Sequence, residues 1–213
     1  MLERWRPLRL VLDDATLTDD EIRLFGTFGE DDELEVWHMR ADLGAHLEIG
    51  DEFECGHGVT VREGTRIGRG VRVGTRSDLQ GDLTVGNYTR LHSNVFVAQK
   101  TTVEDLVWLL PYVVLANDPH PPSDTCTVGP TIRRYAVVGT GATVFPAVEI
   151  GEGALVGAMT LVRDDVPRDS VVVGIPGRVI GPTSDVACRE GKLDRVYPWW
   201  THFRRGYPEG VLP

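Results

Sequence analysis

The chain has 213 residues, of which 41% are hydrophobic, and a formal net charge of -10 at pH 7. This size favours one domain with short flanks, and the negative charge argues against nucleic acid or an anionic membrane as the partner. Nothing approaches membrane-spanning length, and the apolar piece Leu8 to Leu12 is too short for a signal peptide. The three scattered cysteines give neither a disulfide framework nor metal-ligand spacing, so we expect a reducing, cytoplasmic location.

Residues 1–36 carry no repeat. Within them, Thr18 to Glu21 before Ile22 has the pattern of a capping box that opens a short helix. Because a solenoid must cover its ends, we predict that residues 1–36 form an N-terminal cap.

A six-residue apolar repeat begins at Leu43 and continues to Leu115. In triplets such as Val71-Arg72-Val73, an inward, an outward and another inward residue follow one another, which is strand alternation. Such short strands cannot bury a face alone, so the pattern predicts strands and bends that stack on later copies of themselves in a solenoid. The repeat positions are Leu43, Ile49, Cys55, Val61, Ile67, Val73, Leu79, Val85, Leu91, Val97, Val103, Leu109 and Leu115.

The repeat is interrupted once and then returns. Leu115 and Ile132 are not separated by a multiple of six, so we predict that a loop at about residues 118–130 leaves the regular wall. Pro119, Pro121 and Pro122 fit a loop because proline cannot donate to a strand ladder. The second run consists of Ile132, Val138, Val144, Ile150, Val156 and Val162.

Residues 182–213 lack the repeat, and we predict that they form a C-terminal cap or tail. The stretch Ser184 to Val196 is expected to be a short helix. The tail also carries four large aromatic side chains, which we expect to pack on the last coil or on a neighbouring subunit. These are Trp199, Trp200, Phe203 and Tyr207.

The repeat columns, the run Val156 to Pro167 and the closing motif Val172 to Ile180 resemble the hexapeptide-repeat acyltransferases. The resemblance covers about residues 43–181. It implies an all-β fold, a left-handed parallel β-helix with three sides per coil and roughly six coils, in a domain that spans residues 37–181. It also implies a homotrimer that uses acetyl-CoA, or another form of coenzyme A, as co-substrate.

A narrower resemblance lies in the middle of the chain. The motif Leu91 to Val97, followed by Val103-Glu104-Asp105 and Pro111, is similar to the branch that N-acetylates amino sugars on nucleotide carriers. In that branch an Asn in the first motif and an Asn or Asp pair before the loop line the acceptor site. The matching positions here are Asn94, Asn117 and Asp118, which implies a nucleotide-sugar or other small-molecule acceptor.

Acyl transfer from a thioester needs a positioned nucleophile, a group that accepts its proton and donors for the developing oxyanion. An amine can arrive neutral, so Asn94, Asn117 and Asp118 could serve mainly to orient it. A hydroxyl acceptor needs a base, which is a histidine in related O-acetyltransferases, and His120 or His92 would have to supply it. A loop or corner histidine is usually a solvated turn residue, and each Asn can be a corner residue with an unusual dihedral. Asn94 and Asn117 fall on different sides of a triangular coil, so we expect them to converge across a subunit boundary.

For the acyl donor, corner amides could face the pantetheine arm, whose own amides resemble a strand edge. These amides lie near Gly139, Thr140, Gly157 and Ala158. Arg178 matches the basic residue of the closing motif, which in the family commonly meets coenzyme A phosphates. Arg72 and Arg90, one coil apart, could receive an acceptor's diphosphate, although a surface charge ladder is the favoured interpretation.

Three alternatives remain open at this point. A zinc carbonic anhydrase on the same scaffold needs three His ligands, and His38, His57 and His92 do not stack closely enough, so we expect no metal. A catalytically silent binding protein is a second alternative. A serine O-acetyltransferase is a third, disfavoured because the large helical N-terminal region of that family has no counterpart in residues 1–36.

Overall fold

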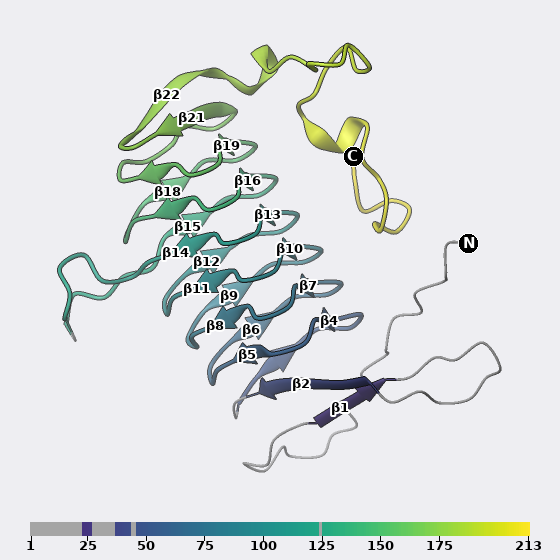
Figure 1. Cartoon of the computed structure of the whole chain (residues 1–213), viewed down its shortest axis with the longest axis vertical. Coiled ribbons are helices and arrows are strands. Elements are labelled where there is room, and N and C mark those ends of the chain that lie inside the picture. Colours follow the sequence, from purple (N-terminus) through teal and green to yellow (C-terminus); the bar gives the residue numbers. More distant parts are fainter. Residues whose placement is uncertain (1–22, 27–36, 44–45, 124) are drawn as a thin grey trace.

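The chain winds into a solenoid of three parallel β-sheets in a computed structural model that describes residues 23–26, 37–43, 46–123 and 125–213 (Figure 1). Sheets 1, 2 and 3 are visited in turn, so each strand pairs with the strand one coil later. The predicted all-β, left-handed parallel β-helix is confirmed, with six full coils and a seventh that has strands in sheets 1 and 3 only among the described residues.

Sheet 1 has eight strands in the described part of the chain, and β1 is its only antiparallel member. Its strands are β1 (Arg23–Gly26), β2 (Trp37–Leu43), β5 (Val59–Val61), β8 (Asp78–Leu79), β11 (Phe96–Val97), β14 (Val114–Leu115), β17 (Thr143–Val144) and β20 (Leu161–Val162). Sheet 2 consists of β3 (Glu48–Ile49), β6 (Arg66–Ile67), β9 (Thr84–Val85), β12 (Thr102–Val103), β15 (Thr131–Ile132) and β18 (Glu149–Ile150).

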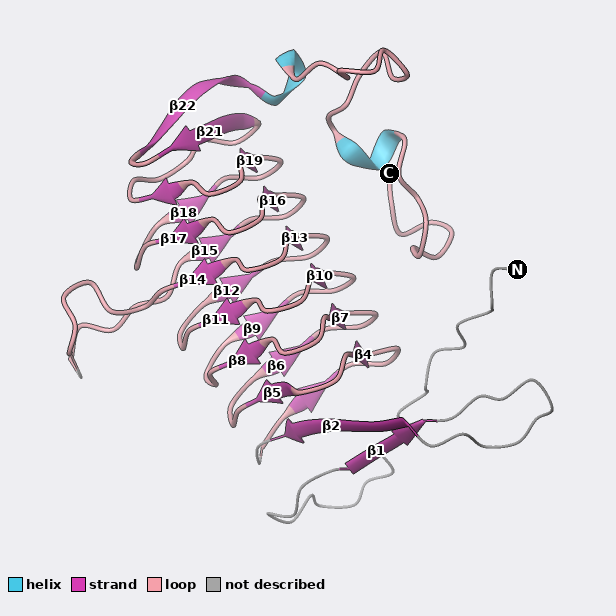
Figure 2. Cartoon of the chain, in the orientation of Figure 1, coloured by secondary structure: helices cyan, strands magenta, loops and turns pink. Residues whose placement is uncertain are grey.

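Sheet 3 ends at an antiparallel hairpin formed by its last two strands. Its strands are β4 (Glu54–Cys55), β7 (Arg72–Val73), β10 (Arg90–Leu91), β13 (Trp108–Leu109), β16 (Val137–Val138), β19 (Leu155–Val156), β21 (Ser170–Gly174) and β22 (Gly177–Pro182). Two short 3-10 turns follow, η1 (Thr183–Asp185) and η2 (Trp199–Thr201), and Figure 2 shows that the rest of the regular structure drawn is strand. No helix among the described residues is long and apolar enough to cross a membrane.

The predicted inward columns form the core. Val97, Leu109 and Ile132 have no solvent-exposed surface, and these aliphatic side chains belong to one continuous cluster that fills the prism. Partners in neighbouring coils before the loop are 18 residues apart, as in Phe96↔Val114. A parallel ladder in this register puts every sixth residue inside, which is why the periodicity alone predicts the fold.

The loop between β14 and β15 leaves the solenoid at one corner (Figure 1). Thr102 pairs with Thr131, a separation of 29 residues where the preceding coils use 18. The ladder therefore resumes in register after the insertion. We call the corner between sheets 1 and 2 the first corner, that between sheets 2 and 3 the second, and that between sheets 3 and 1 the third.

The predictions for the two ends of the sequence have different outcomes. The predicted capping box, Thr18 to Glu21, lies outside the described residues, but the short helix that it was expected to open is wrong, because Arg23–Gly26 is the strand β1. Most of the predicted N-terminal cap also lies outside the described residues, and the division into three segments stays a prediction. The predicted helix at Ser184 to Val196 is wrong, because only the turn Thr183–Asp185 is helical in that stretch. The rest of the stretch is irregular, with one turn and two isolated bends, and most of its side chains are exposed.

The tail aromatics pack on the middle coils, so the expectation that they cover the last coil is wrong. Trp199 is 7% exposed, donates its Nε1–H to the Tyr135 carbonyl at 3.1 Å and lies 5.9 Å from the Trp108 ring. Trp108 and Val137 are outward residues of sheet 3, and Tyr135 is a corner residue beside them. Apolar side chains that face outward on a sheet need a cover, which the tail supplies.

Arg90 is also buried by the tail, which excludes it as a receptor for an acceptor's diphosphate. It is 7% exposed, donates to the Gly70 carbonyl at 2.8 Å and to the Gly206 carbonyl, and lies 4.7 Å above the Tyr207 ring. Burial lowers the pKa of its guanidinium. Arg72 pairs with Glu54 at 2.7 Å, as expected for a member of a surface charge ladder.

Truncating one inward side chain tests the packed prism. We expect Leu109→Ala to lower the free energy of unfolding by about 2–5 kcal/mol, because it leaves a cavity in a core that cannot collapse along a fixed ladder. The matched control is Thr102→Ala, an outward exposed strand residue, with an expected change within about 0.5 kcal/mol. Urea unfolding followed by circular dichroism measures both, and equal effects would contradict the assignment of inward and outward columns.

Candidate functional site

The third corner is a stack of turns with one residue per coil in the left-handed region. Arg76, Asn94, Tyr112 and Met159 have φ of 57°, 60°, 64° and 57°. Each of their amides donates to a carbonyl one coil below, as Asn94 does to Thr75 at 2.9 Å. Successive corners are therefore spaced like strands, about 4.8 Å apart. Residues far apart in the sequence are thereby lined up along one edge of the prism.

Asn94, the first predicted acceptor residue, lies on this edge. It is half-buried, and its φ of 60° shows that it also satisfies the backbone demand of the corner, for which Asn is well suited. Its side-chain Oδ1 accepts a hydrogen bond from the Nε–H of Arg76 at 3.3 Å.

The four predicted donor-binding residues lie higher on the same edge. A Cβ on Gly139 would come within 2.6 Å of the Ala158 amide nitrogen, so glycine allows the two corners to stack closely. Thr140 and Ala158 are exposed, and their amides donate no hydrogen bond among the described residues. Pro111 occupies the equivalent place two coils below Ala158 and has no N–H. The edge therefore offers unused backbone donors at two successive coils.

Arg178 lies just beyond the upper end of this edge. A Cβ on the preceding Gly177 would lie 3.1 Å from both the Leu161 carbonyl and Thr160 Cγ2, so the β21–β22 turn rests on the top coil. The Arg178 guanidinium is exposed, and Asp164 lies 3.9 Å away from it. An exposed pair at that distance contributes little, so the guanidinium is available to a phosphate.

Asn117, Asp118 and His120 lie instead at the first corner, where the loop begins. The Asn117 carbonyl accepts from the Val128 amide at 2.8 Å and closes the loop at its base. Asp118 accepts from the His120 amide at 3.1 Å with Oδ1 and from the Ser123 amide at 2.8 Å with Oδ2. The carboxylate thus shapes the loop that carries the exposed His120, a role that sequence reasoning missed.

Lys100 holds the other limb of the same loop, which was also not predicted. It stands at the first corner one coil below and donates to Thr127 Oγ1 at 2.6 Å and to the Thr127 carbonyl at 3.1 Å. The outline of the loop is therefore fixed by two charged side chains, Asp118 and Lys100. No periodic pattern marks such contacts in the sequence.

The predicted residues fall into two groups, separated by the width of sheet 1. Asn94 shares the third corner with the donor-binding residues, whereas Asn117, Asp118 and His120 share the first corner. Between the corners, Phe96 and Val114 are in register on the outer face of sheet 1, and Phe96 is 37% exposed. Convergence of the two groups across a subunit boundary stays a prediction.

His92, the other candidate base, faces the tail side of the molecule. Its ring centroid lies 5.6 Å from that of Trp108, on sheet 3, and its partial burial lowers its pKa. This shift favours the neutral form of the imidazole. However, it is turned toward the sheet that the tail covers.

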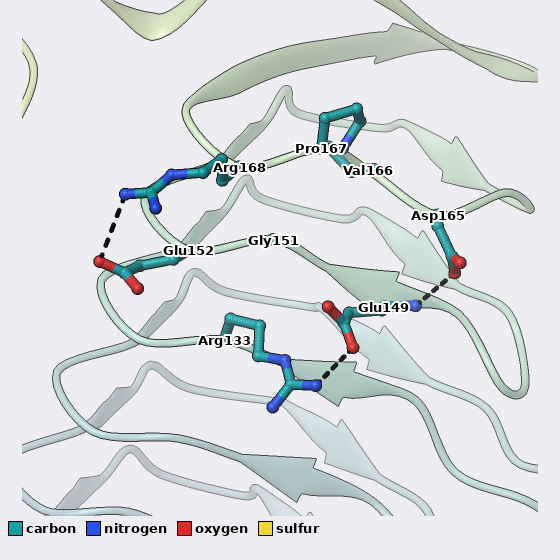
Figure 3. Close-up of a pocket in the computed structure, with 8 residues that line it drawn as sticks. All are labelled: Arg133, Glu149, Gly151, Glu152, Asp165, Val166, Pro167 and Arg168. Carbon is teal, nitrogen blue, oxygen red and sulfur yellow. Dashed lines mark hydrogen bonds and ion pairs between the residues drawn. The ribbon is translucent and has the colours of Figure 1, made fainter.

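A depression on the outside of sheet 2 and the second corner contains none of the predicted residues (Figure 3). Arg133 donates to Glu149 at 2.6 Å and to Glu104 at 2.7 Å, and the hydrogen bond from Arg133 lowers the pKa of Glu149. Arg168 lies 3.8 Å from Glu152. The arginines that line this depression, Arg133 and Arg168, are thus paired with carboxylates of the same chain. No group of three or more His, Cys, Asp or Glu among the described residues could hold a metal ion.

No family model matches the chain, but sequence and structure relatives exist. A serine acetyltransferase of Buchnera aphidicola subsp. Acyrthosiphon pisum is 33% identical over 92 residues, which cover 43% of this chain and 33% of that protein. The polySia specific acetyltransferase NeuO shares the fold with a TM-score of 0.55 at 21% identity, covering 72% of this chain and 74% of that one. AntD, an N-acyltransferase from Bacillus cereus, solved as a mutant with dTDP and coenzyme A, has a TM-score of 0.52 at 19% identity, covering 67% and 83%.

The chain is thus a β-helix of hexapeptide repeats, and part of it is similar in sequence to serine acetyltransferases. It spans between 21% and 33% of the length of the first curated relatives that it matches. These relatives are serine acetyltransferases, so the expectation that amino-sugar N-acetyltransferases are its nearest kin is not confirmed.

Removing the Asp118 carboxylate tests its part in the loop. We expect Asp118→Ala to expose residues 119–127 to limited proteolysis, because two backbone amides lose a charged acceptor. Asp118→Asn, which keeps one side-chain oxygen, should be intermediate. An unchanged cleavage rate together with lost activity would indicate instead that Asp118 contacts the acceptor directly.

Proposed function

We propose that the protein is a coenzyme A-dependent acyltransferase that moves an acetyl or other short acyl group to the amino group of a nucleotide-linked amino sugar. The observation that carries the proposal is the alignment of Asn94 with the unused amides of Thr140 and Ala158 along one edge. The named activities of the relatives, serine acetyltransferases by sequence and acetyl- or acyltransferases by fold, support the class of reaction.

The donor would lie along the third corner. Pantetheine carries amide groups separated by short apolar links, and an edge with free N–H groups at two successive coils can pair with them as a strand edge does. Exposed Met159, beside Ala158, offers apolar contact to the links. Arg178, beyond the top coil, would meet the phosphates, because its forked guanidinium matches their geometry. The thioester end then points down the edge toward Asn94.

The acceptor would lie on the side of sheet 1. An amine that arrives neutral attacks without a strong base, so positioning groups suffice. Asn94 would be supplied by one subunit, and Asn117 and the His120 loop by its neighbour, in a homotrimer that packs through the outer face of sheet 1, where Phe96 and Val114 are in register. We propose a cytoplasmic location, in keeping with the free cysteines of the described chain.

The sequence relatives favour a second candidate, O-acetylation of a small hydroxyl acceptor such as serine. A hydroxyl needs a base. His120 would fill that role, since its ring is exposed on a loop whose shape Asp118 and Lys100 fix. The two candidates share the donor site and differ in whether catalysis needs the imidazole.

A screen of amino and hydroxy acceptors with acetyl-CoA separates the two candidates. We expect transfer to a nucleotide-linked amino sugar, with His120→Ala retaining most of the rate. Near-total loss of the rate in His120→Ala, measured with a hydroxyl acceptor, would support O-acetylation. No transfer and no rise of the unfolding midpoint with coenzyme A would contradict both candidates, because a ligand of the native state must stabilise it.

Removing one unused amide tests the donor site without altering a side chain that packs. We expect Ala158→Pro to raise KM for acetyl-CoA roughly two- to tenfold, the value of one hydrogen bond, and Pro111 shows that this corner position accepts proline. Glu152→Pro is the matched control: it also follows a buried or half-buried glycine, but it lies at the second corner, and its amide likewise donates to no described residue. An equal change of KM in both variants would contradict the assignment.

A further inference from the structure

Arg76 differs from three other arginines of its coil in what it binds. Arg66, Arg69 and Arg72, in the same coils, each pair with a carboxylate one coil below: Glu48 at 3.2 Å, Glu52 at 2.6 Å and Glu54 at 2.7 Å. Arg76 makes no such pair among the described residues. It donates its Nε–H upward, to Oδ1 of Asn94 at 3.3 Å.

The backbone directs this contact. Arg76 and Asn94 both occupy the left-handed position of the third corner, one coil apart, and the Asn94 amide donates to the carbonyl of Thr75. A Cβ on Gly58, at the same position one coil below, would lie 3.5 Å from Cγ of Arg76, so the arginine stem belongs to the corner column. The guanidinium therefore stays next to Asn94.

The contact settles which end of the Asn94 amide faces outward. Guanidinium Nε is a donor only, and the asparagine side chain has one accepting oxygen and one donating nitrogen. The oxygen must therefore face Arg76, and the nitrogen with its two N–H groups faces away. This nitrogen donates to no described residue. Toward a substrate, the Asn94 side chain therefore presents its N–H donors, and a neutral amide is not a base for the proton of an amine.

We propose that Arg76 is a positioning residue that makes Asn94 the oxyanion donor for the thioester carbonyl. This inference rests on the proposed acyl transfer. The amine nitrogen attacks the carbonyl carbon, and negative charge collects on the carbonyl oxygen. The C–S bond then breaks, the ammonium proton leaves to solvent or to the thiolate, and amide and free coenzyme A thiol result. An N–H donor aimed at that oxygen stabilises the intermediate.

The place of Asn94 along the edge fits this role. Asn94 and Met159, the neighbour of Ala158, are three coils apart at the third corner, about 14 Å at strand spacing. A donor whose amides pair with Thr140 and Ala158 would extend down the edge, so its thioester would lie toward Asn94. The positive charge of Arg76 also polarises the amide and strengthens its N–H as a donor.

A double-mutant cycle with steady-state kinetics tests the inference. We expect Arg76→Met to lower kcat about tenfold, with KM for each substrate within about twofold, and to have no further effect in an Asn94→Ala background. Arg76→Gln, whose amide can still donate to Oδ1, should recover part of the rate. Asn94→Asp should lose at least as much as Asn94→Ala, because it places acceptor oxygens where the N–H donors stood.

Arg69→Met is the matched control, since it removes a corner arginine of the same coil that pairs with Glu52, and its kcat should be unchanged. Additive losses for Arg76→Met and Asn94→Ala, or equal losses for Arg76→Met and Arg69→Met, would overturn the inference. If Arg76→Met does not fold, as judged by its thermal midpoint, Arg76→Gln replaces it in both backgrounds, and additive losses would again overturn the inference. Failure of the proposed function itself is distinguishable, because the unmodified protein would then transfer no acyl group.

Discussion

The parallel ladder between successive coils is the constraint from which the rest of the structure follows. Each inward side chain must sit above the one a coil below, so the length of a coil cannot vary along a wall. Extra residues are tolerated only where the chain turns. The insertion before β15 shows this, since Thr102 still pairs with Thr131 although the intervening chain is longer than in earlier coils. Functional loops can therefore be added at a corner without disturbing the core.

The same ladder creates the candidate donor site. Corner residues stack at strand spacing, so backbone groups that point outward recur at a fixed interval along an edge. Most corner amides are used in bonds to the coil below, as at Tyr112 and Met159. The amides one residue earlier are left over at Thr140 and Ala158, while Pro111 has none to offer. Unused amides of this kind also occur at other corners, as at Glu152, so they supply donors along this edge, while Asn94 and Arg178 near its two ends distinguish it from the others.

The sequence predicted the features that repeat and missed those that do not. Aliphatic residues at every sixth position identify the wall, because a buried column tolerates little else, and Asn94 could be placed on an edge for the same reason. The covering of sheet 3 by the tail could not be predicted, since Trp199 and its neighbours have no period that would assign them to particular coils. Arg90 likewise occupies an outward strand position that normally faces solvent, and only the tail buries it.

The contacts that shape the loop could not be predicted either. Asp118 and Lys100 bind groups of the loop whose positions depend on its backbone conformation, and no sequence pattern indicates that conformation. Asp118 matched a motif for acceptor binding, yet both of its oxygens accept from amides of its own loop. The two interpretations are compatible, since a residue that shapes the loop also places His120. The motif match thus identified the segment that contains Asp118 and His120. The three-dimensional structure was needed to show that Asp118 binds amides of the loop that carries His120.

The three walls of the prism differ in what they leave available. The tail covers sheet 3 over its middle coils, and the outer face of sheet 2 carries the ion pairs of Arg66 and Arg133. On the outer face of sheet 1, Phe96 is partly exposed, and Val114 lies beside it on the strand one coil later. Both groups of candidate residues border this wall, one at each of its corners. A neighbouring subunit that contacts both groups of one chain must therefore lie along sheet 1, where Phe96 and Val114 offer apolar surface that its binding would remove from water.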